Sequence, residues 1–213
     1  MRSWMRVLPF LMLWASGVGG AELHVSVHDA QGQPVADAVI SLDRDGFSGN
    51  VSAVAQTHVI DQRDETFIPY VQTFRTHDRV VFLNSDRTRH HVYSFSPLKP
   101  FETVLSPGES SEPLSLDKPG IIAVGCNIHD RMIAYLHVSD AWRVETASER
   151  GVAAFAALPM ETLRVSVWHP RLLSEGVALA REVALGPEPA TVDFEIRLAP
   201  DPRHRKDRER SVY

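Results

Sequence analysis

Residues 120–138 have the sequence GIIAVGCNIHDRMIAYLHV. Two apolar runs flank a short polar loop, and both are rich in the β-branched and aromatic residues that strands favour. The loop carries Cys126, His129 and Met132, each three residues from the next. This stretch predicts two neighbouring strands joined by a loop that holds a thiol, an imidazole and a thioether.

Strand patterns continue outward from this stretch along most of the chain. Alternating or short apolar runs recur in segments 23–27, 38–42, 58–60, 67–71, 79–83, 91–95, 163–168 and 191–198. Glycine and proline interrupt the chain at short intervals, and no helical period lasts ten residues between positions 22 and 170. These features predict an antiparallel β-sandwich, with Tyr93 and Phe95 packed inside it. Residues 172–185 form either a short helix or an extended loop followed by a strand.

The composition restricts the class of protein. One cysteine among 213 residues excludes an intrachain disulfide. With 22 Lys and Arg against 27 Asp and Glu, the formal net charge is −5, and this acidic balance argues against nucleic-acid binding. A lone cysteine is most often a buried apolar residue. The nearby histidine and methionine are what make Cys126 a candidate metal ligand.

Both ends of the chain differ from the strand-rich part. Residues 1–21 resemble a secretory signal peptide, because two arginines precede an apolar core at 7–14 and small residues follow up to Ala21. We expect cleavage after Ala21, a periplasmic location and no membrane span in the mature chain; the alternative is a retained anchor. Loss of the two arginines leaves 20 basic against 27 acidic residues, a formal charge of −7. Residues 200–213 are mostly charged, which predicts a disordered tail.

Thiolate, imidazole and thioether groups are soft or borderline ligands that together suit copper. Three of them on one loop can converge on one ion, and a fourth ligand must then come from a neighbouring strand. His90 and His91 are the candidates, since they lie where a turn ends and a strand begins. Successive strand residues point to opposite faces, so only one of the two should face the metal. Met132 has the alternative role of a core residue.

The segment 57–140 resembles the cupredoxins, the blue-copper proteins, and its loop spacing resembles that of the amicyanins. The resemblance rests on Phe67-Ile68-Pro69, on a strand that ends at Asn84 six residues before His90, on Lys118-Pro119-Gly120 and on the Cys-x-x-His-x-x-Met loop. Asn84 and Asn127 are expected to cap or bridge loops and not to bind the metal.

This resemblance implies a ligand set and an activity. Position by position, it assigns His90, Cys126 and His129 as strong ligands of one type 1 copper ion and Met132 as the long axial ligand. Such a trigonal set is the geometry of blue-copper electron-transfer sites. It implies a periplasmic one-electron carrier whose redox partner is a dehydrogenase or a c-type cytochrome. The whole chain also resembles proteins labelled methylamine utilization protein, which implies a link to amine oxidation.

The chain departs from the amicyanin pattern at three positions. His91 stands where amicyanin and plastocyanin have an asparagine that ties the two ligand loops together. It either does the same or offers a competing ligand. Asp130 and Arg131 stand where amicyanin has proline and phenylalanine, which makes the electron-transfer face less apolar and favours a polar or charged partner surface.

The outer segments resemble a transthyretin-like β-sandwich, on the strength of residues 25–39 and of the stretch from Gly151 to Val167. We therefore predict such a section from residues 22–50 and 141–199, with a cupredoxin domain at 55–140 inserted between them. The predicted fold class is all-β, an antiparallel Greek-key cupredoxin sandwich combined with this second β-sandwich section.

Two other functions compete with the electron carrier. One is a copper-binding or copper-delivery module without redox turnover, which could add His91 to the ligands. The other is a metal-free β-sandwich interaction domain. An enzyme is least favoured, because no nucleophile with a base stands out and a Cys-His hydrolase would not explain Met132.

Overall fold

The structure is a computed structural model that describes residues 20–47, 49, 54–129, 131–173 and 178–204. Within these residues the chain is all-β, as the strand patterns predict, and the one helical element is the 3-10 turn η1 (Pro202–His204). No helix in this described part is long and apolar enough to cross a membrane. The expected signal peptide falls almost entirely on residues 1–19, outside the described residues.

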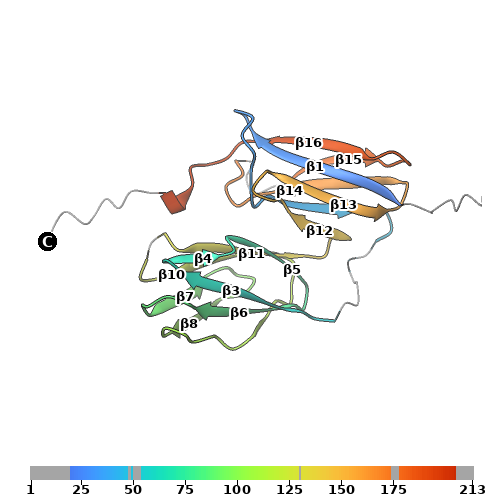
Figure 1. Ribbon diagram of the computed structural model, residues 1–213. Helices are drawn as coiled ribbons and strands as arrows, with labels where there is room; N and C mark the ends of the chain where they lie inside the picture. The colour runs from blue at the N-terminus through green and yellow to red at the C-terminus, as the bar shows by residue number, and fades with distance from the viewer. Residues whose placement is uncertain (1–19, 48, 50–53, 130, 174–177, 205–213) are drawn as a thin grey trace, which may run out of the picture.

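The strands follow one another along the whole described chain (Figure 1). They are β1 (Ala21–Asp29), β2 (Val39–Asp43), β3 (Thr57–Arg63), β4 (Thr66–Ile68), β5 (Val71–Arg75), β6 (Arg79–Asn84), β7 (His90–Ser94), β8 (Phe101–Leu105), β9 (Leu114–Ser115), β10 (Gly120–Cys126), β11 (Ile133–Ser139), β12 (Arg143–Thr146), β13 (Val152–Leu158), β14 (Thr162–Trp168), β15 (Leu179–Ala184) and β16 (Ala190–Ile196). They form four sheets that pack in pairs.

Strands from the two ends of the chain build one body, which we call the outer sandwich and which lies at the top of Figure 1. Its sheets have the strand orders β13-β1-β16 and β12-β2-β14-β15. The two sheets enclose one core, to which Leu23, Phe155 and Phe194 contribute from the first sheet and Leu42 and Val165 from the second. Side chains of β1 alternate between buried and more exposed, as expected for a strand with one face on a core.

The middle of the chain builds a second body, the inner sandwich, at the bottom of Figure 1. Its sheets have the orders β5-β11-β10-β7-β8 and β4-β3-β6-β9, and Ile60, Phe82, Val92 and Leu136 lie in the core between them. Most neighbouring strands are antiparallel, but β3 pairs with β6, and β5 with β11, in parallel. Parallel pairing needs a crossover, and the chain provides it by passing through the opposite sheet between the paired strands.

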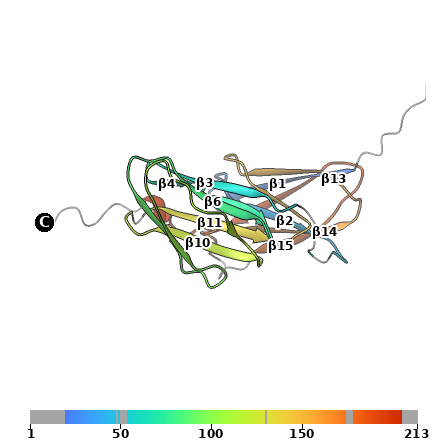
Figure 2. The same ribbon diagram turned by 90° about the horizontal axis from the view of Figure 1, so that it is seen from below.

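A third buried cluster joins the two sandwiches, which lie one above the other in Figure 1 and overlap in the view from below in Figure 2. The Tyr135 ring of β11 packs edge-on against Tyr70, with ring centroids 5.6 Å apart, and against Trp168 of the outer sandwich at 6.2 Å. Arg203 of η1 lies over the Tyr70 ring, 3.6 Å from its centroid. The tail expected from residue 200 therefore begins with a structured turn, and residues 205–213 lie outside the described residues.

The stretch 172–185 follows the second of its two predicted alternatives. Leu172 forms an isolated bridge with Leu198, and β15 then pairs antiparallel with β14. Residues 174–177 between them lie outside the described residues.

The expected packing of Phe95 inside the sandwich is wrong, because its side chain is 85% exposed. Strand β7 buries His90, Val92 and Ser94, so the odd-numbered side chains face the other way. The period-two rule that separates His90 from His91 therefore also places Phe95 outside.

Gly151 occupies a backbone position that no other residue fits. Its φ of +70° is in the left-handed region, and an added Cβ would lie 2.4 Å from the Val27 carbonyl oxygen and 2.9 Å from the Val35 nitrogen. We expect Gly151→Ala to lose about 1–2 kcal/mol of unfolding free energy through the left-handed backbone and a further ~1–3 kcal/mol through steric overlap. Gly32→Ala is the matched control, since Gly32 has a φ of +74° but open space around it. Equal losses in urea unfolding would contradict the steric part.

The buried His169 makes the stability of the fold depend on pH. Its Nδ1 accepts the Arg171 N–H at 3.1 Å, which requires an unprotonated Nδ1. Burial, with the nearby Arg171 and Arg203 cations, lowers the pKa of His169 from 6.5 to about 4. Between these two values the unfolded chain binds a proton that the folded chain does not. Stability is therefore complete above pH 6.5 and falls as the pH drops towards 4.

We expect His169→Asn, whose side-chain oxygen can still accept the Arg171 N–H, to flatten this dependence. Near pH 5 the slope of unfolding free energy against pH should decrease by about 1.4 kcal/mol per pH unit. Urea unfolding at a series of pH values measures it. His77→Asn, at an exposed site whose φ of 76° asparagine tolerates, is the control and should leave the slope unchanged.

Candidate metal centre

Two loops meet at one end of the five-stranded sheet of the inner sandwich. Strand β10 runs antiparallel to β7, with Cys126 opposite Val92 and Gly125 opposite Tyr93. Cys126 ends β10 and His90 begins β7, so this pairing places both residues at the same end of neighbouring strands. The register alone thus brings together two residues that are 36 positions apart in the sequence.

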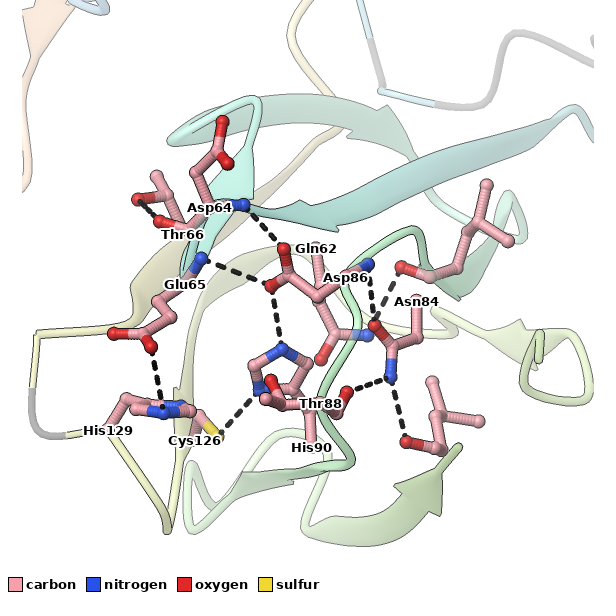
Figure 3. Close-up of polar contacts among 12 residues, drawn as sticks. Gln62, Asp64, Glu65, Thr66, Asn84, Asp86, Thr88, His90, Cys126 and His129 are labelled. Carbon is pink, nitrogen blue, oxygen red and sulfur yellow. Dashed lines mark hydrogen bonds and ion pairs between the residues drawn. The ribbon is translucent and has the colours of Figure 1, made fainter. Parts of the chain in front are cut away.

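His90 and Cys126 face each other inside the sandwich, as Figure 3 shows. The His90 Nδ1 atom lies 3.6 Å from Cys126 Sγ, and both side chains are buried. The choice of His90, which rests on its position six residues after Asn84, therefore agrees with the side of β7 that faces the cysteine.

The loop after β10 folds back and returns His129 to Cys126. The Cys126 N–H donates to the Met132 carbonyl at 3.2 Å, and the Met132 N–H donates to the His129 carbonyl at 3.0 Å. With the loop closed in this way, one potential ligand atom each from His90, Cys126 and His129 lies within 4.8 Å of the other two. The structure thus brings together three of the four predicted ligands.

The two ring nitrogens of His129 have different surroundings. Nε2 lies 3.4 Å from Glu65 Oε1, on the side where this 19%-exposed side chain reaches the surface. Nδ1 is buried and has no hydrogen-bond partner among the residues that the structure describes. Buried polar atoms are normally satisfied, so a metal bond at this nitrogen fits the arrangement.

His91 lies on the opposite face of β7 from His90. Its Nε2 is 3.5 Å from Glu102 Oε2, and its ring packs edge-on against Tyr93. The backbone of His91 nevertheless joins the two ligand loops, because its carbonyl accepts the Asn127 N–H at 3.0 Å. The tie that an asparagine side chain makes in the resembled proteins is made here by main-chain atoms.

Met132 is buried and belongs to the same core cluster as Cys126. Its main chain closes the ligand loop through the two hydrogen bonds described above. Burial suits both of its expected roles, axial ligand and core residue, so ligation by Met132 stays a prediction.

Asp86, four residues before His90, is a site residue that sequence reasoning missed. Its Oδ2 lies 2.8 Å from His90 Nε2, and its two oxygens accept the main-chain N–H groups of Asp64 at 2.6 Å and Glu65 at 3.1 Å. Burial alone would raise the pKa of Asp86, but the hydrogen bond from His90 and those from the two main-chain groups hold it below its usual value. The only signal for Asp86 in the sequence is its position four residues before His90. No feature of the sequence indicates Glu65.

Asn84 organises the loop that carries Asp86 and His90. Its buried amide group donates to the carbonyls of Thr88 and Leu105, both at 2.9 Å, and its side-chain oxygen accepts the Asp86 N–H at 3.0 Å. The expectation that Asn84 bridges loops is confirmed.

The donor set consists of two imidazole nitrogens and one sulfur, with His90 and Cys126 buried and His129 partly exposed. Nitrogen and thiolate donors together suit copper, and they also suit zinc. Convergence of these side chains, one of which has a buried Nδ1 with no partner among the described residues, identifies this cluster as the candidate metal centre.

The similarity to known proteins covers only part of the chain. No protein-family model and no curated protein matches it. A Cu-containing nitrite reductase (NirK) from Thermus scotoductus SA-01 is 25% identical over 38% of this chain and 22% of its own, with a TM-score of 0.36. A purple cupredoxin from Nitrosopumilus maritimus is 17% identical over 40% of this chain and 100% of its own, with a TM-score of 0.35.

A reduced tyrosine-for-tryptophan mutant of amicyanin is 13% identical over 47% of this chain and 98% of its own, with a TM-score of 0.37. The chain therefore spans less than a quarter of the nitrite reductase but the whole or nearly the whole length of the two cupredoxins. Because every TM-score is below 0.5, we argue the function from the site of this chain.

We expect Asn84→Asp to destabilise the inner sandwich even without metal. The substitution removes both amide donors and places a carboxylate against the Thr88 and Leu105 carbonyl oxygens, at a cost of about 3 kcal/mol or more. Urea unfolding of the copper-free protein at neutral pH measures the loss. Asn127→Asp, on the exposed part of the ligand loop, is the matched control and should change stability by no more than ~0.5 kcal/mol.

Proposed function

We propose that this chain is a type 1 copper protein of the cupredoxin kind and acts as a one-electron carrier. The observation that carries the proposal is the convergence of His90, Cys126 and His129 within 4.8 Å, with both Cys126 and His90 buried. His90 Nδ1, His129 Nδ1 and Cys126 Sγ would be the strong ligands, and Met132 the axial one. Bound copper would supply one-electron cycling between its +1 and +2 states.

The surroundings of the ligands favour electron transfer over substrate chemistry. Three of the four proposed ligands are buried, and His129 alone reaches the surface, with 19% of its side chain exposed. A substrate molecule needs an open coordination position, whereas an electron needs only a short path to the surface. Main-chain hydrogen bonds and Asn84 hold both ligand loops, which suits a centre whose geometry changes little between oxidation states.

Location and partners extend the proposal beyond the site. The signal-peptide pattern of residues 1–21 supports export to the periplasm. There the redox partner would be a dehydrogenase or a c-type cytochrome. The link to amine oxidation rests on the resemblance in sequence. We further propose that the outer sandwich is the transthyretin-like section and the inner sandwich the cupredoxin domain.

The copper-delivery alternative has less support from the geometry. His91, the ligand that it could add, faces Glu102 on the opposite side of β7. The metal-free alternative leaves the buried Nδ1 of His129 without a partner among the described residues.

Copper loading tests the proposal directly. The Cu(II)-loaded protein should bind one ion per chain and show the strong visible absorption of a thiolate–copper bond, and Cys126→Ser should remove the colour. His90→Gln should weaken Cu(II) binding more than ~100-fold. The matched variant His91→Gln should keep both colour and affinity.

Three outcomes would overturn the proposal. They are a colourless Cu(II) form, colour that survives in Cys126→Ser, and tight stoichiometric zinc with no copper binding. Metal content and visible absorption, measured on the same samples, separate these outcomes.

A further inference from the structure

Both imidazoles of the candidate metal centre have a carboxylate at their Nε2 atom. His90 Nε2 lies 2.8 Å from Asp86 Oδ2, and His129 Nε2 lies 3.4 Å from Glu65 Oε1. Figure 3 shows both contacts on the same side of the cluster. Nothing in the ligand set itself requires this arrangement.

One turn supplies or holds both carboxylates. Asp64 and Glu65 form the two-residue connection between β3 and β4, where Arg63 pairs with Thr66. Their φ values of 52° and 54° are those of a hairpin turn with both central residues left-handed. Both turn N–H groups point at Asp86, which accepts them at 2.6 and 3.1 Å. The turn therefore fixes Asp86 through its main chain and presents Glu65 as a side chain.

We propose that this turn and Asp86 place two carboxylates on the outer nitrogens of the histidines, and that these carboxylates position both rings and lower the reduction potential of the copper site. The inference rests on the proposed function and names residues that act through the ligands. Asp86 and Glu65 are positioning residues, because each carboxylate contacts the Nε2 atom of a histidine.

Positioning follows from the hydrogen bond to the ring. A carboxylate can only accept, so His90 carries a proton on Nε2, and the neutral ring then presents an unprotonated Nδ1 to Cys126. Such outer-shell acceptors fix the tautomer and ring orientation of metal-ligating histidines and increase their basicity. Asp86 is itself held by two main-chain donors, so it cannot turn away without breaking them.

The effect on the potential follows from charge. A fixed negative charge near the ion stabilises Cu(II) more than Cu(I), because the attraction scales with the charge of the ion. The Asp86 side chain is 11% exposed and that of Glu65 is 57% exposed, so solvent screens Glu65 more strongly. Removal of either charge should therefore raise the potential, and removal of Asp86 should raise it further.

Redox titration of the copper-loaded protein tests this ranking. Asp86→Asn should weaken Cu(II) binding ~10–100-fold and Cu(I) binding less, and a tenfold difference between the two corresponds to a rise of ~59 mV in midpoint potential. Glu65→Gln should shift it in the same direction by less. Glu102→Gln is the matched control, because Glu102 is an exposed carboxylate paired with His91, away from the cluster. It should leave the potential unchanged.

A measurement on the copper-free protein tests the positioning of His90 by Asp86 independently of copper binding. The Nε2 proton of His90 should give a slowly exchanging resonance in ¹H–¹⁵N NMR spectra near neutral pH. It should disappear in Asp86→Ala and persist in Glu65→Gln. An Nδ1-protonated His90 in the wild-type protein would overturn the positioning role.

The outcomes separate this inference from the proposed function. A wild-type protein that binds no copper would refute the electron carrier, while the NMR result would still decide the role of Asp86. A wild-type protein with a coloured copper site, whose potential is the same in Asp86→Asn and Glu65→Gln, would leave the electron-carrier proposal intact and refute the role of the two carboxylates in setting the potential. In that case Asp86 only anchors the turn. Asp86→Asn would then reduce the unfolding free energy and leave the reduction potential unchanged.

Discussion

The candidate metal centre depends on the antiparallel pairing of β7 with β10. The register that places Cys126 opposite Val92 brings the end of one strand to the start of the other, so His90 faces the sulfur without any adjustment of the loops. The hydrogen bond from the Asn127 N–H to the His91 carbonyl extends this pairing into the ligand loop. A slip of one residue would turn His90 to the outer face and His91 inward, because side chains alternate along a strand.

The two sandwiches together hold both flanks of the ligand loop. On one flank β10 is paired with β7, and on the other β11 packs through Tyr135 against Trp168 of the outer sandwich. Strand β11 also lies between β10 and β5 in its sheet: Ile133, where it begins, pairs with Gly125 of β10, and the pairing with β5 begins at Tyr135. A site built at the ends of such strands keeps its ligands closer to one geometry than a site on a free loop would. The outer sandwich thereby supports the site without contributing a ligand.

Much of this arrangement was predictable because the information is local. Alternation along β7 separates His90 from His91, and the spacing in one loop groups Cys126, His129 and Met132. The same alternation, continued from Ser94 at the end of β7 to the next residue, would have placed Phe95 on the outer face. Asp86 and Glu65 were not predictable, because Asp86 meets the Asp64–Glu65 turn only through the parallel pairing of β3 with β6, and a residue pattern does not specify such a pairing. The parallel strand pairs were not predictable from the alternation of buried and exposed residues either, because a strand shows the same alternation in a parallel pair and in an antiparallel pair.

The proposed effect of Asp86 on the potential has its physical basis in the charge balance inside the sandwich. A thiolate bound to a metal at Cys126 and the Asp86 carboxylate, both at buried or nearly buried positions, would together carry two negative charges. A divalent cation held by Cys126 and the two histidines would neutralise them, whereas a monovalent cation would leave one negative charge uncompensated. Burial of a net charge is unfavourable, so the interior favours the divalent state. Glu65, mostly in water, adds little to this balance and acts mainly on the exposed edge of His129. If copper binds at this cluster, the protein would set the preference between its oxidation states through groups that contact the Nε2 atoms of the two histidines.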